Sequence, residues 1–327
     1  MSESGLPRLR FAHLPTPVEP MPRLAAALGG PSLWVKRDDQ TGLALGGNKA
    51  RKLEFILAQA QADGARLLIT TGAVQSNQCR QTAAAAARFG FDCLLVLPGS
   101  PPAAANGNLL LDGLLGAEIR WCGNELKEVA LQRIFDDAWA AGRRPYLVPY
   151  GASSPLGAAG YIAAMYEWME QGHDVDWIIV ASSSGGTQAG LVAGARLAGY
   201  RGRVLGVSVD VPAAELRAKV AELATQAASL WGQPAEFRPD EIDVTDEYIG
   251  GGYGVLGDLE RDAVRLFARS EGILLDPVYT GRAAGGMLDL IRRGEIRPDS
   301  RVLFWHTGGA PAIFAYAAEL TQRGPAN

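Results

Sequence analysis

The feature that most constrains the fold of this chain is the unbroken alternation of short apolar runs with amphipathic stretches. Strands that alternate with helices form βαβ units, in which parallel strands are covered by helices. Apolar runs such as 92–97 and 176–181 agree with this, because parallel strands are buried on both faces. We therefore predict an α/β fold with mostly parallel sheets covered by helices.

The predicted elements follow one another without a repeat, a low-complexity segment or a Gly/Ser linker. Strands are predicted at 32–36, 66–70, 92–97, 118–122, 145–148, 176–181, 204–209 and 301–305. Helices are predicted at 21–28, 82–89, 108–115, 126–141, 157–171, 187–198, 213–230, 259–270, 281–292 and 312–320, with one more that starts at Lys49. The segment 240–258 has no regular pattern.

Length and charge exclude several classes of protein. A chain of 327 residues suits two domains or one large α/β unit, and a net charge of −4 argues against nucleic-acid binding. No apolar run is long enough to span a membrane, and the N-terminus lacks a secretory signal. The three cysteines are odd in number and lack metal spacing, and the three histidines lie far apart. We expect a cytoplasmic enzyme with reduced thiols and no metal, which binds neither nucleic acid nor membrane.

A glycine-rich turn followed by two lysines, at residues 42–54, indicates a reactive site. Gly46 and Gly47 allow the backbone to bend tightly and approach a ligand, and Asn48 is expected to cap the helix that follows. Lys49 and Lys52 lie side by side at i and i+3, next to the positive end of the helix dipole. That end attracts anions and disfavours a proton on a neighbouring amine. One lysine is therefore a candidate nucleophile for imine formation, and the other a candidate partner for a phosphate.

Composition supports a chemical role for this stretch. The chain has 31 Lys and Arg residues, of which only five are Lys, and three of those five lie between Lys36 and Lys52. Arginine serves wherever a positive charge is enough, but it cannot lose its proton and form a Schiff base, as lysine can. A solvated first helical turn is the alternative interpretation.

Three loops that follow predicted strands carry residues suited to ligand binding, since open α/β sheets bind ligands beyond the carboxyl ends of their strands. In the first loop, 71–78, Ser76 and Asn77 precede a helix and can bind a carboxylate. In the second, 182–187, small residues expose successive N–H groups at a helix start, which favours phosphate. In the third, 306–311, Thr307 can donate a hydrogen bond to a heterocyclic nitrogen. An ordinary turn or helix cap remains the alternative for each loop.

Two tyrosines accompany these loops. Tyr253 stands among glycines in the segment 250–254, and Tyr279 lies just before the predicted helix 281–292. Most tyrosines pack with one hydrogen bond and have no catalytic role. Tyr253 is a candidate because a bulky side chain among glycines is presented to its surroundings, and Tyr279 because it lies at the start of a helix.

Taken together and in order, the motifs Gly-Gly-Asn-Lys-Ala-Arg-Lys, Gln-Ser-Asn-Gln, Ser-Gly-Gly-Thr, Pro-Val-Tyr-Thr-Gly and His-Thr-Gly-Gly are specific. The chain resembles the pyridoxal-phosphate enzymes of the D-cysteine desulfhydrase and 1-aminocyclopropane-1-carboxylate deaminase family, from about Trp34 to Tyr316. The resemblance implies a tryptophan-synthase-β-like fold (fold type II), with pyridoxal 5'-phosphate between two domains of a homodimer subunit. It implies a large cofactor-binding domain of residues 1–46 plus 159–327, and a small inserted domain of residues 47–158.

The resemblance also implies roles for individual residues. Lys49 would hold the cofactor covalently, and Lys52 would neutralise its phosphate. Asn77 would bind the phenolic oxygen of the cofactor and Ser76 the substrate carboxylate, with Ser76 also a candidate proton carrier. The remaining implied site residues are Gln78 at the substrate, Ser184, Gly185, Gly186 and Thr187 around the phosphate, Tyr253 and Tyr279 facing the substrate, and Thr307 near the pyridine nitrogen.

The expected reaction is β-elimination from a small amino acid by a carbon–sulfur lyase, with D-cysteine as the expected substrate. Ring-opening deaminases of the family carry an acidic residue where this chain has Thr280 and an aliphatic one at Thr307, so the chain departs from that activity. Gln78 and Gln188 are closer to the deaminase pattern, and the triple glycine before Tyr253 fits neither. Three alternatives stay open: 1-aminocyclopropane-1-carboxylate deaminase activity, L-cysteate sulfo-lyase activity and a non-enzymatic amino-acid-binding module on the same fold.

Overall fold

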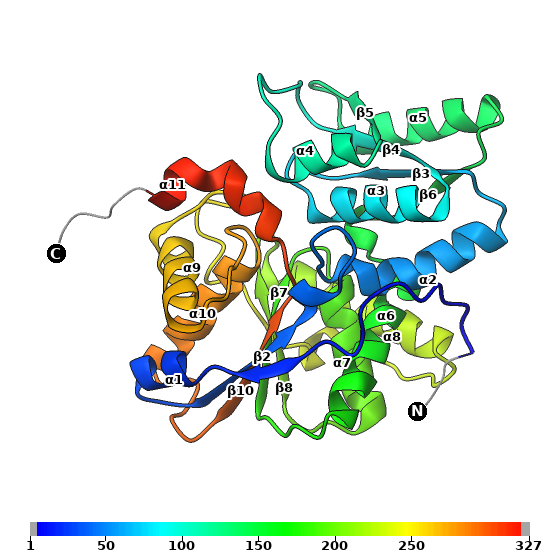
Figure 1. Cartoon of the computed structure of the whole chain (residues 1–327). Helices are drawn as coiled ribbons and strands as arrows, with labels where there is room; N and C mark the ends of the chain where they lie inside the picture. Colours follow the sequence, from blue (N-terminus) through cyan, green and yellow to red (C-terminus); the bar gives the residue numbers. More distant parts are fainter. Residues whose placement is uncertain (1–4, 322–327) are drawn as a thin grey trace.

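The computed structural model describes residues 5–321. It contains two sheets of mostly parallel strands, and each sheet is covered by helices (Figure 1). The larger sheet has six strands, and the smaller has four. Every described strand pair is parallel except the pair at one edge of the larger sheet. The predicted α/β fold with mostly parallel sheets is confirmed.

The larger sheet takes its strands from both ends of the chain. In spatial order they are β1 (Val18–Pro20), β2 (Ser32–Arg37), β10 (Arg301–His306), β7 (Trp177–Ser182), β8 (Arg203–Ser208) and β9 (Val244–Thr245). One face packs against α1 (Pro22–Leu28), α9 (Asp258–Glu271) and α10 (Thr280–Arg292). Against the other lie α6 (Pro155–Glu170), α7 (Gly186–Ala198) and α8 (Ala213–Leu230). Figure 1 shows these two layers on opposite sides of the sheet.

The smaller sheet comes from one continuous segment of the chain. Its strands in spatial order are β5 (Glu118–Trp121), β4 (Asp92–Leu97), β3 (Leu67–Thr71) and β6 (Pro145–Leu147). On one face lie α2 (Lys49–Ala62), α3 (Asn77–Phe89) and α4 (Gly107–Leu114), and on the other lies α5 (Lys127–Ala140).

Alternation along the strands explains why both faces of the smaller sheet are covered. Leu67 and Ile69 point towards α5, whereas Leu68 between them packs with α2 and α3. Successive side chains of a strand face opposite sides of the sheet, so an apolar run must have a helix on each side. Burial of each of these leucine or isoleucine side chains contributes about 1.5–3 kcal/mol to the stability of the fold relative to an exposed side chain. The apolar runs seen in the sequence therefore require the two helical layers that the structure has.

Four predicted boundaries or elements differ from the structure. Helix α3 begins at Asn77 and not at residue 82, because Ser76 caps it and the polar residues after it lie within the helix. The short strands β1 and β9 were not predicted, since three and two residues carry no periodicity. The last predicted helix, 312–320, consists of a 3-10 helix, η4 (Ala310–Tyr316), followed by α11 (Ala317–Thr321). Further 3-10 turns are η1 (Asp38–Gln40), η2 (Tyr150–Ala152) and η3 (Pro239–Glu241).

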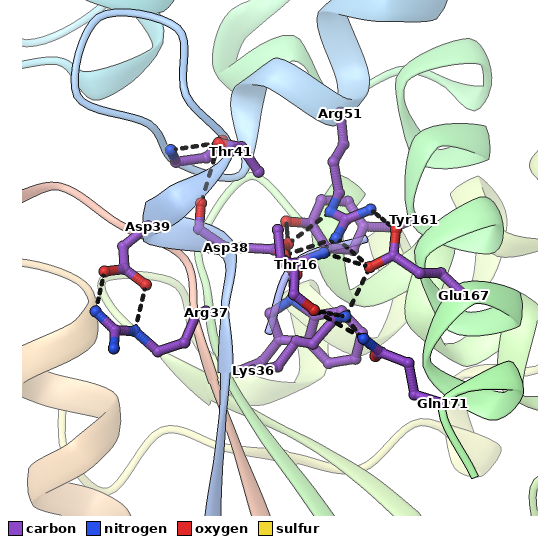
Figure 2. A network of polar contacts seen from close by, with 12 residues as sticks. Thr16, Lys36, Arg37, Asp38, Asp39, Thr41, Arg51, Tyr161, Glu167 and Gln171 are labelled. Carbon is purple, nitrogen blue, oxygen red and sulfur yellow. Dashed lines mark hydrogen bonds and ion pairs between the residues drawn. The ribbon is translucent and has the colours of Figure 1, made fainter. Parts of the chain in front are cut away.

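A buried set of charged side chains fastens the first turn of α2 to the larger sheet (Figure 2). Arg51 of α2 lies 2.8 Å from Asp38 of η1 and 2.9 Å from Glu167 of α6. Lys36 of β2 lies 2.6 Å from Glu167 and donates to the carbonyl oxygen of Thr16 at 2.8 Å. We call these five residues the Asp38 network. They join α2, η1, β2 and α6 just beyond Lys49.

Among residues 5–321, no helix combines the length and the apolar character that a membrane span requires.

Candidate active site

The loops that follow β3, β7 and β10 meet in one pocket. β7 and β10 are neighbours in the larger sheet, so the loops after them are adjacent. The pocket is lined by residues from these loops and the end of β7, from the start of α2, from η2 and from the turn before α10. They are Asn48, Lys49, Ser76, Asn77, Gln78, Tyr150, Gly151, Ala181, Ser182, Ser183, Ser184, Gly185, Thr187, Tyr279 and Thr307. Three residues proposed from the sequence, Lys52, Gly186 and Tyr253, lie outside this lining but next to it.

The glycine turn before Lys49 has no room for a side chain. Gly47 has φ 124°, and a Cβ there would stand 2.5 Å from Gln81 Nε2 and 3.2 Å from the carbonyl oxygen of Thr307. The turn therefore lies against the loop after β10, and the N–H of Asn48 donates to that same carbonyl at 2.9 Å. The expected side-chain cap by Asn48 is wrong: its amide reaches across to Thr187 Oγ1 at 3.0 Å. Asn48 thus ties the start of α2 to the loop after β7.

The amines of Lys49 and Lys52 converge on one carbonyl. Lys49 Nζ donates to Gly151 O at 2.9 Å, and Lys52 Nζ lies 3.2 Å from the same oxygen and 3.3 Å from Ser153 Oγ. Burial lowers the pKa of Lys49 to about 8. Burial and then repulsion by Lys49 lower the pKa of Lys52 well below its usual value. Within residues 5–321 neither amine has an acidic ion-pair partner, so the pair is suited to an anionic ligand.

The loop after β7 meets these lysines through a serine that the sequence did not single out. Ser153 Oγ lies 2.7 Å from Ser184 Oγ and accepts from the N–H of Gly186 at 3.2 Å. A Cβ on Gly186 would stand 2.6 Å from Ser153 Oγ, so only glycine fits there. α7 begins at Gly186, and its N-terminus supplies N–H groups that have no acceptor within the helix, together with positive potential. Lys52, Ser153 and the start of α7 therefore lie together at a place suited to phosphate.

The loop after β3 presents the N-terminus of α3 to the same pocket. Ser76 is the N-cap, and its Oγ accepts from the N–H of Cys79 at 3.1 Å, which leaves its own hydrogen free to donate. Asn77 occupies the first helical position and lines the pocket. Gln78 also lines the pocket, but its amide is turned away, with Nε2 donating to Thr70 Oγ1 at 2.9 Å and to Thr82 Oγ1 at 3.0 Å. Its amide is therefore already occupied by β3 and α3.

The two tyrosines form a hydrogen-bonded pair at the edge of the pocket. Tyr279 lines the pocket, and its Oη lies 2.8 Å from Tyr253 Oη. Their rings are edge to face, with centroids 5.8 Å apart. Burial raises the pKa of both phenols above the usual value, so both hold their protons at neutral pH.

Two threonines that the sequence singled out have different surroundings. Thr307 lines the pocket, whereas Thr280 is buried, and its hydroxyl lies 2.7 Å from Asp276 Oδ1. Asp276 also accepts from the N–H groups of Val278, Tyr279 and Thr280 at 2.8–3.0 Å. This carboxylate, which the sequence reasoning missed, shapes the turn that carries Tyr279.

Gln188, the second glutamine that matches the deaminase pattern, does not line the pocket. Its Nε2 donates to the carbonyl oxygen of Asp243 at 2.8 Å, next to β8 and β9. It contributes to packing beside the larger sheet and does not line this pocket.

Comparison with known proteins identifies the class to which this arrangement belongs. The family model described as "Pyridoxal-phosphate dependent enzyme" matches residues 9–308. The chain belongs to this family, and pyridoxal phosphate is its cofactor.

Individual relatives cover nearly the whole chain. A D-cysteine desulfhydrase of Salmonella typhimurium is 44% identical over 319 residues, which cover 95% of this chain and 96% of that protein. A D-cysteine desulfhydrase of Salmonella typhi is 43% identical with the same coverage. The crystal structure of an ACC deaminase homologue has a TM-score of 0.90 and 37% identity, and covers 97% of this chain and 96% of that one. The family resemblance expected from the motifs is confirmed.

A more distant structure confirms the fold alone. An L-serine ammonia-lyase from Rhizomucor miehei is 19% identical, with a TM-score of 0.69 over 96% of this chain and 98% of that one. That enzyme and this chain share fold type II.

The pocket has the donor set that pyridoxal phosphate requires. Two buried amines without an acidic partner among residues 5–321 need an anion, and a phosphate dianion is one. The start of α7 adds N–H donors for that phosphate, and Lys49 supplies an amine whose pKa of about 8 lets it lose a proton near neutral pH. No group of three or more His, Cys, Asp or Glu suited to a metal ion occurs in the described part of the chain.

Proposed function

We propose that this chain is a D-cysteine desulfhydrase, which converts D-cysteine and water to pyruvate, sulfide and ammonia. Relatives of that name share 43–44% of its residues over almost its full length. The observation that carries the proposal is the convergence of Lys49, Ser76 and Tyr279 on one pocket. These residues supply a base, a site for the substrate carboxylate and a proton donor.

When bound, pyridoxal phosphate withdraws electrons from the α-carbon of an attached amino acid and so acidifies the α-proton. Lys49 is the residue that would hold the cofactor and, once released by the substrate, remove that proton on Nζ. Its pKa of about 8 leaves part of the amine unprotonated at neutral pH, as a base and nucleophile needs.

The N-terminus of α3 would bind the substrate carboxylate. The Ser76 hydroxyl has a free hydrogen, and the first N–H groups of α3 have no partner within their own helix. The helix dipole adds positive potential at this position. Asn77 would donate to the phenolic oxygen of the cofactor, and Thr307 would lie near its ring nitrogen.

The tyrosine pair would serve the departing sulfur. The Cβ–S bond breaks with its electron pair on sulfur, which then needs a proton. Tyr279 and Tyr253 both hold their protons at neutral pH and share a hydrogen bond, so one can donate while the other supports it. The released enamine reacts with water to give pyruvate and ammonia.

Lys52, Ser184, Gly185, Gly186 and Thr187 would hold the phosphate. Burial and Lys49 lower the pKa of Lys52, so a bound phosphate would favour its protonated, charged form, and the start of α7 would supply the N–H groups. Phosphate binding would also relieve the repulsion between the two buried amines.

The test is a substrate panel on purified protein with added cofactor. We expect a yellow protein whose visible band is bleached by borohydride, with the reduced cofactor attached to the peptide that contains Lys49. D-Cysteine should give pyruvate and sulfide in equal amounts, in preference to L-cysteine, D-serine and L-cysteate. A colourless protein that takes up no cofactor, or a cofactor fixed to another lysine, would overturn the proposal.

The second candidate is 1-aminocyclopropane-1-carboxylate (ACC) deaminase, because an ACC deaminase homologue is among the similar crystal structures. This activity would release 2-oxobutyrate from that substrate. Thr280, at the position where the deaminases carry an acid, is bound to Asp276 and does not line the pocket. This supports the desulfhydrase over the deaminase. Formation of 2-oxobutyrate alone in the panel would reverse the choice.

A sulfo-lyase and a non-catalytic binding module have less support. L-Cysteate carries a sulfonate that would favour an arginine, and no arginine lines the pocket within residues 5–321. An amino-acid-binding module without catalysis would not need an amine with a lowered pKa such as that of Lys49. Binding of D-cysteine without turnover would support the binding module.

We propose that residues 1–46 and 159–327 form the large domain and 47–158 the small one, because the smaller sheet uses a single segment of the chain. We also propose a homodimer. Leu110 and Leu114 of α4 and Phe314 of η4 are 46%, 74% and 69% exposed, and these two elements pack against each other. Light scattering should give twice the mass of the chain, and a monomer at micromolar concentration would refute the dimer.

The proposed compartment is the cytoplasm, where thiols stay reduced. Cys79, Cys93 and Cys122 are all free in the structure. The proposed partner is a small amino acid, with no nucleic acid and no membrane, as the net charge of −4 favours. Cell fractionation would test the location.

A further inference from the structure

Asn108 stands just outside the pocket and contacts one of its residues. It lies on the first turn of α4 and is fully buried. Its Nδ2 donates to the carbonyl oxygen of Gln75 at 2.9 Å and to Asn77 Oδ1 at 2.9 Å. Its backbone N–H donates to Gln75 Oε1 at 2.8 Å. One buried amide therefore joins the start of α4 to the loop that carries Ser76 and Asn77.

These contacts fix the orientation of two amide groups. A backbone carbonyl can only accept, so the atom of Asn108 that faces Gln75 O must be its nitrogen. A backbone N–H can only donate, so Gln75 Oε1 must face it. The second hydrogen on Asn108 Nδ2 then points at Asn77, whose oxygen must turn towards it.

The amide nitrogen of Asn77 is consequently turned away from Asn108. A Cβ placed on Gly309 would stand 2.8 Å from Asn77 Nδ2, so this nitrogen lies beside the loop after β10. Asn77 also lines the pocket. Because Asn77 Oδ1 already accepts from Asn108, the group that the Asn77 side chain offers to the pocket is its N–H donor.

We propose that Asn108 is a positioning residue that keeps the Asn77 amide turned with its N–H groups towards the cofactor. The proposal rests on the proposed function, in which Asn77 donates to the phenolic oxygen of pyridoxal phosphate. In that orientation Asn77 stabilises negative charge on the oxygen. Turned by 180°, the amide would set its own oxygen against the phenolic one.

The backbone around this contact leaves little freedom for rearrangement. Gly107 has φ 52°, and a Cβ there would stand 2.5 Å from Gln75 Oε1 and 2.8 Å from the carbonyl oxygen of Pro311. α4 is thus pressed against both the loop after β3 and η4. The start of α4, which carries Asn108, is therefore fixed between Gln75 and Pro311.

The variant Asn108→Asp tests the proposal. It keeps the size of the side chain but replaces the donor by a carboxylate, which requires Asn77 to turn its nitrogen towards it. The matched control is Asn106→Asp, which adds the same charge two residues away. Asn106 is exposed, and its side-chain Oδ1 accepts from Gln75 Nε2 at 3.2 Å, a contact that a carboxylate preserves.

The measurement is the pH titration of the visible absorption band of the bound cofactor, with the cofactor dissociation constant as a second readout. Loss of the donor makes the phenolic oxygen more basic, so the titration midpoint of Asn108→Asp should rise by about one pH unit, a tenfold change in proton affinity. Cofactor should bind about tenfold more weakly. Asn106→Asp should titrate and bind as the unmodified protein does.

The outcomes separate this proposal from the proposed function. If unmodified protein and control both bind cofactor but Asn108→Asp titrates with them, the positioning role is wrong. If the unmodified protein binds no cofactor, the proposed function fails first. Should Asn108→Asp not fold, Asn108→Ala replaces it. That variant frees the Asn77 amide to turn and should raise the midpoint by a smaller amount, and an unchanged midpoint would overturn the proposal equally.

Discussion

Replacing Arg51 with methionine should destabilise the protein by about 3–5 kcal/mol, because it leaves a buried carboxylate without its main counter-charge. Arg51 binds both oxygens of Asp38, at 2.8 and 2.9 Å, and both side chains are no more than 1% exposed. In the variant, Asp38 keeps three uncharged donors. They are Thr16 Oγ1 at 2.8 Å, Tyr161 Oη at 2.6 Å and Trp305 Nε1 at 2.8 Å.

The pKa of Asp38 gives the size of the effect. Burial by itself would raise this pKa, but Arg51 acts against it most strongly, and the result is a fall from 3.8 to about 2. That fall corresponds to about 2 kcal/mol of stability. Because the folded-state pKa is depressed, this contribution is present above pH 4 and is lost as the pH falls through 2. Removing Arg51 forfeits it and exposes the cost of burial as well.

The assay is urea unfolding at pH 7, followed by circular dichroism. The control is Arg120→Met, which breaks a 2.7 Å bond to Glu118 at the surface, where Arg120 is 61% exposed. It should cost less than about 1 kcal/mol. Adding Asp38→Asn to Arg51→Met should recover part of the loss, since no buried charge then remains at that position. The reasoning would be refuted if Arg51→Met lowered the free energy of unfolding by less than about 1 kcal/mol and the added Asp38→Asn restored none of it.

Three further predictions concern the site. Lys49→Arg should abolish turnover, whereas Lys52→Arg should retain it and mainly weaken cofactor binding, because only the first position needs an amine that loses its proton; equal loss of turnover in both would contradict this. The cofactor-free protein should gain up to about 3 kcal/mol of stability between pH 8 and 10.5, the folded-state and usual pKa values of Lys49, because the unfolded chain binds more protons across that window. Urea unfolding at pH 8 and at pH 10.5 measures this gain, and the control variant Lys49→Met should show a smaller one. A stability that stays constant or falls between these pH values would be evidence against the buried amine. Tyr279→Phe should lower kcat for D-cysteine by about 10²–10⁴-fold with the visible band of the cofactor unchanged, since it removes a proton donor but no cofactor contact; a variant as active as the unmodified enzyme would exclude that role.

Local patterns in the sequence were enough to predict most of the architecture. The apolar runs became strands because a run buried on both sides must lie between two helical layers. The loops at 182–187 and 306–311 were recognised because small residues directly after a buried strand have few other uses. Both loops do reach the pocket, and Lys49 lies there with them.

Residues that act through neighbours distant in sequence were not predictable in this way. Ser153 and Asn108 belong to unremarkable segments, and their meaning comes from Ser184 and Asn77, which lie 31 residues away in each case. Asn48 was expected to cap its own helix because that is the commonest local use of asparagine, but a partner from the loop after β7 takes its amide.

Lys36 shows the same limit from the other direction. It is one of three scarce lysines in a short stretch, which suggested chemistry somewhere in that stretch. The structure buries it against Glu167, Thr16 and Gln171, and it does not line the pocket that contains Lys49. In a chain that uses lysine sparingly, a lysine indicates a position where arginine does not fit the requirement. A small, buried site for an ammonium group, such as that of Lys36, is one such position.

The division of the pocket between the two sheets bears on how such an enzyme acquires a new substrate. The loop after β3 of the smaller sheet carries Ser76 and Asn77, whereas the loop after β7 of the larger sheet carries Ser184, Gly185 and Thr187. Changes at residues 71–74 and at Ser76 can therefore alter which amino acid is accepted, while Asn77 and the other residues that would hold the cofactor stay unchanged. Directed evolution confined to residues 71–74 and Ser76 would explore new substrates from a starting point that still binds its cofactor, because Gln75, Asn77 and Asn108 stay unchanged.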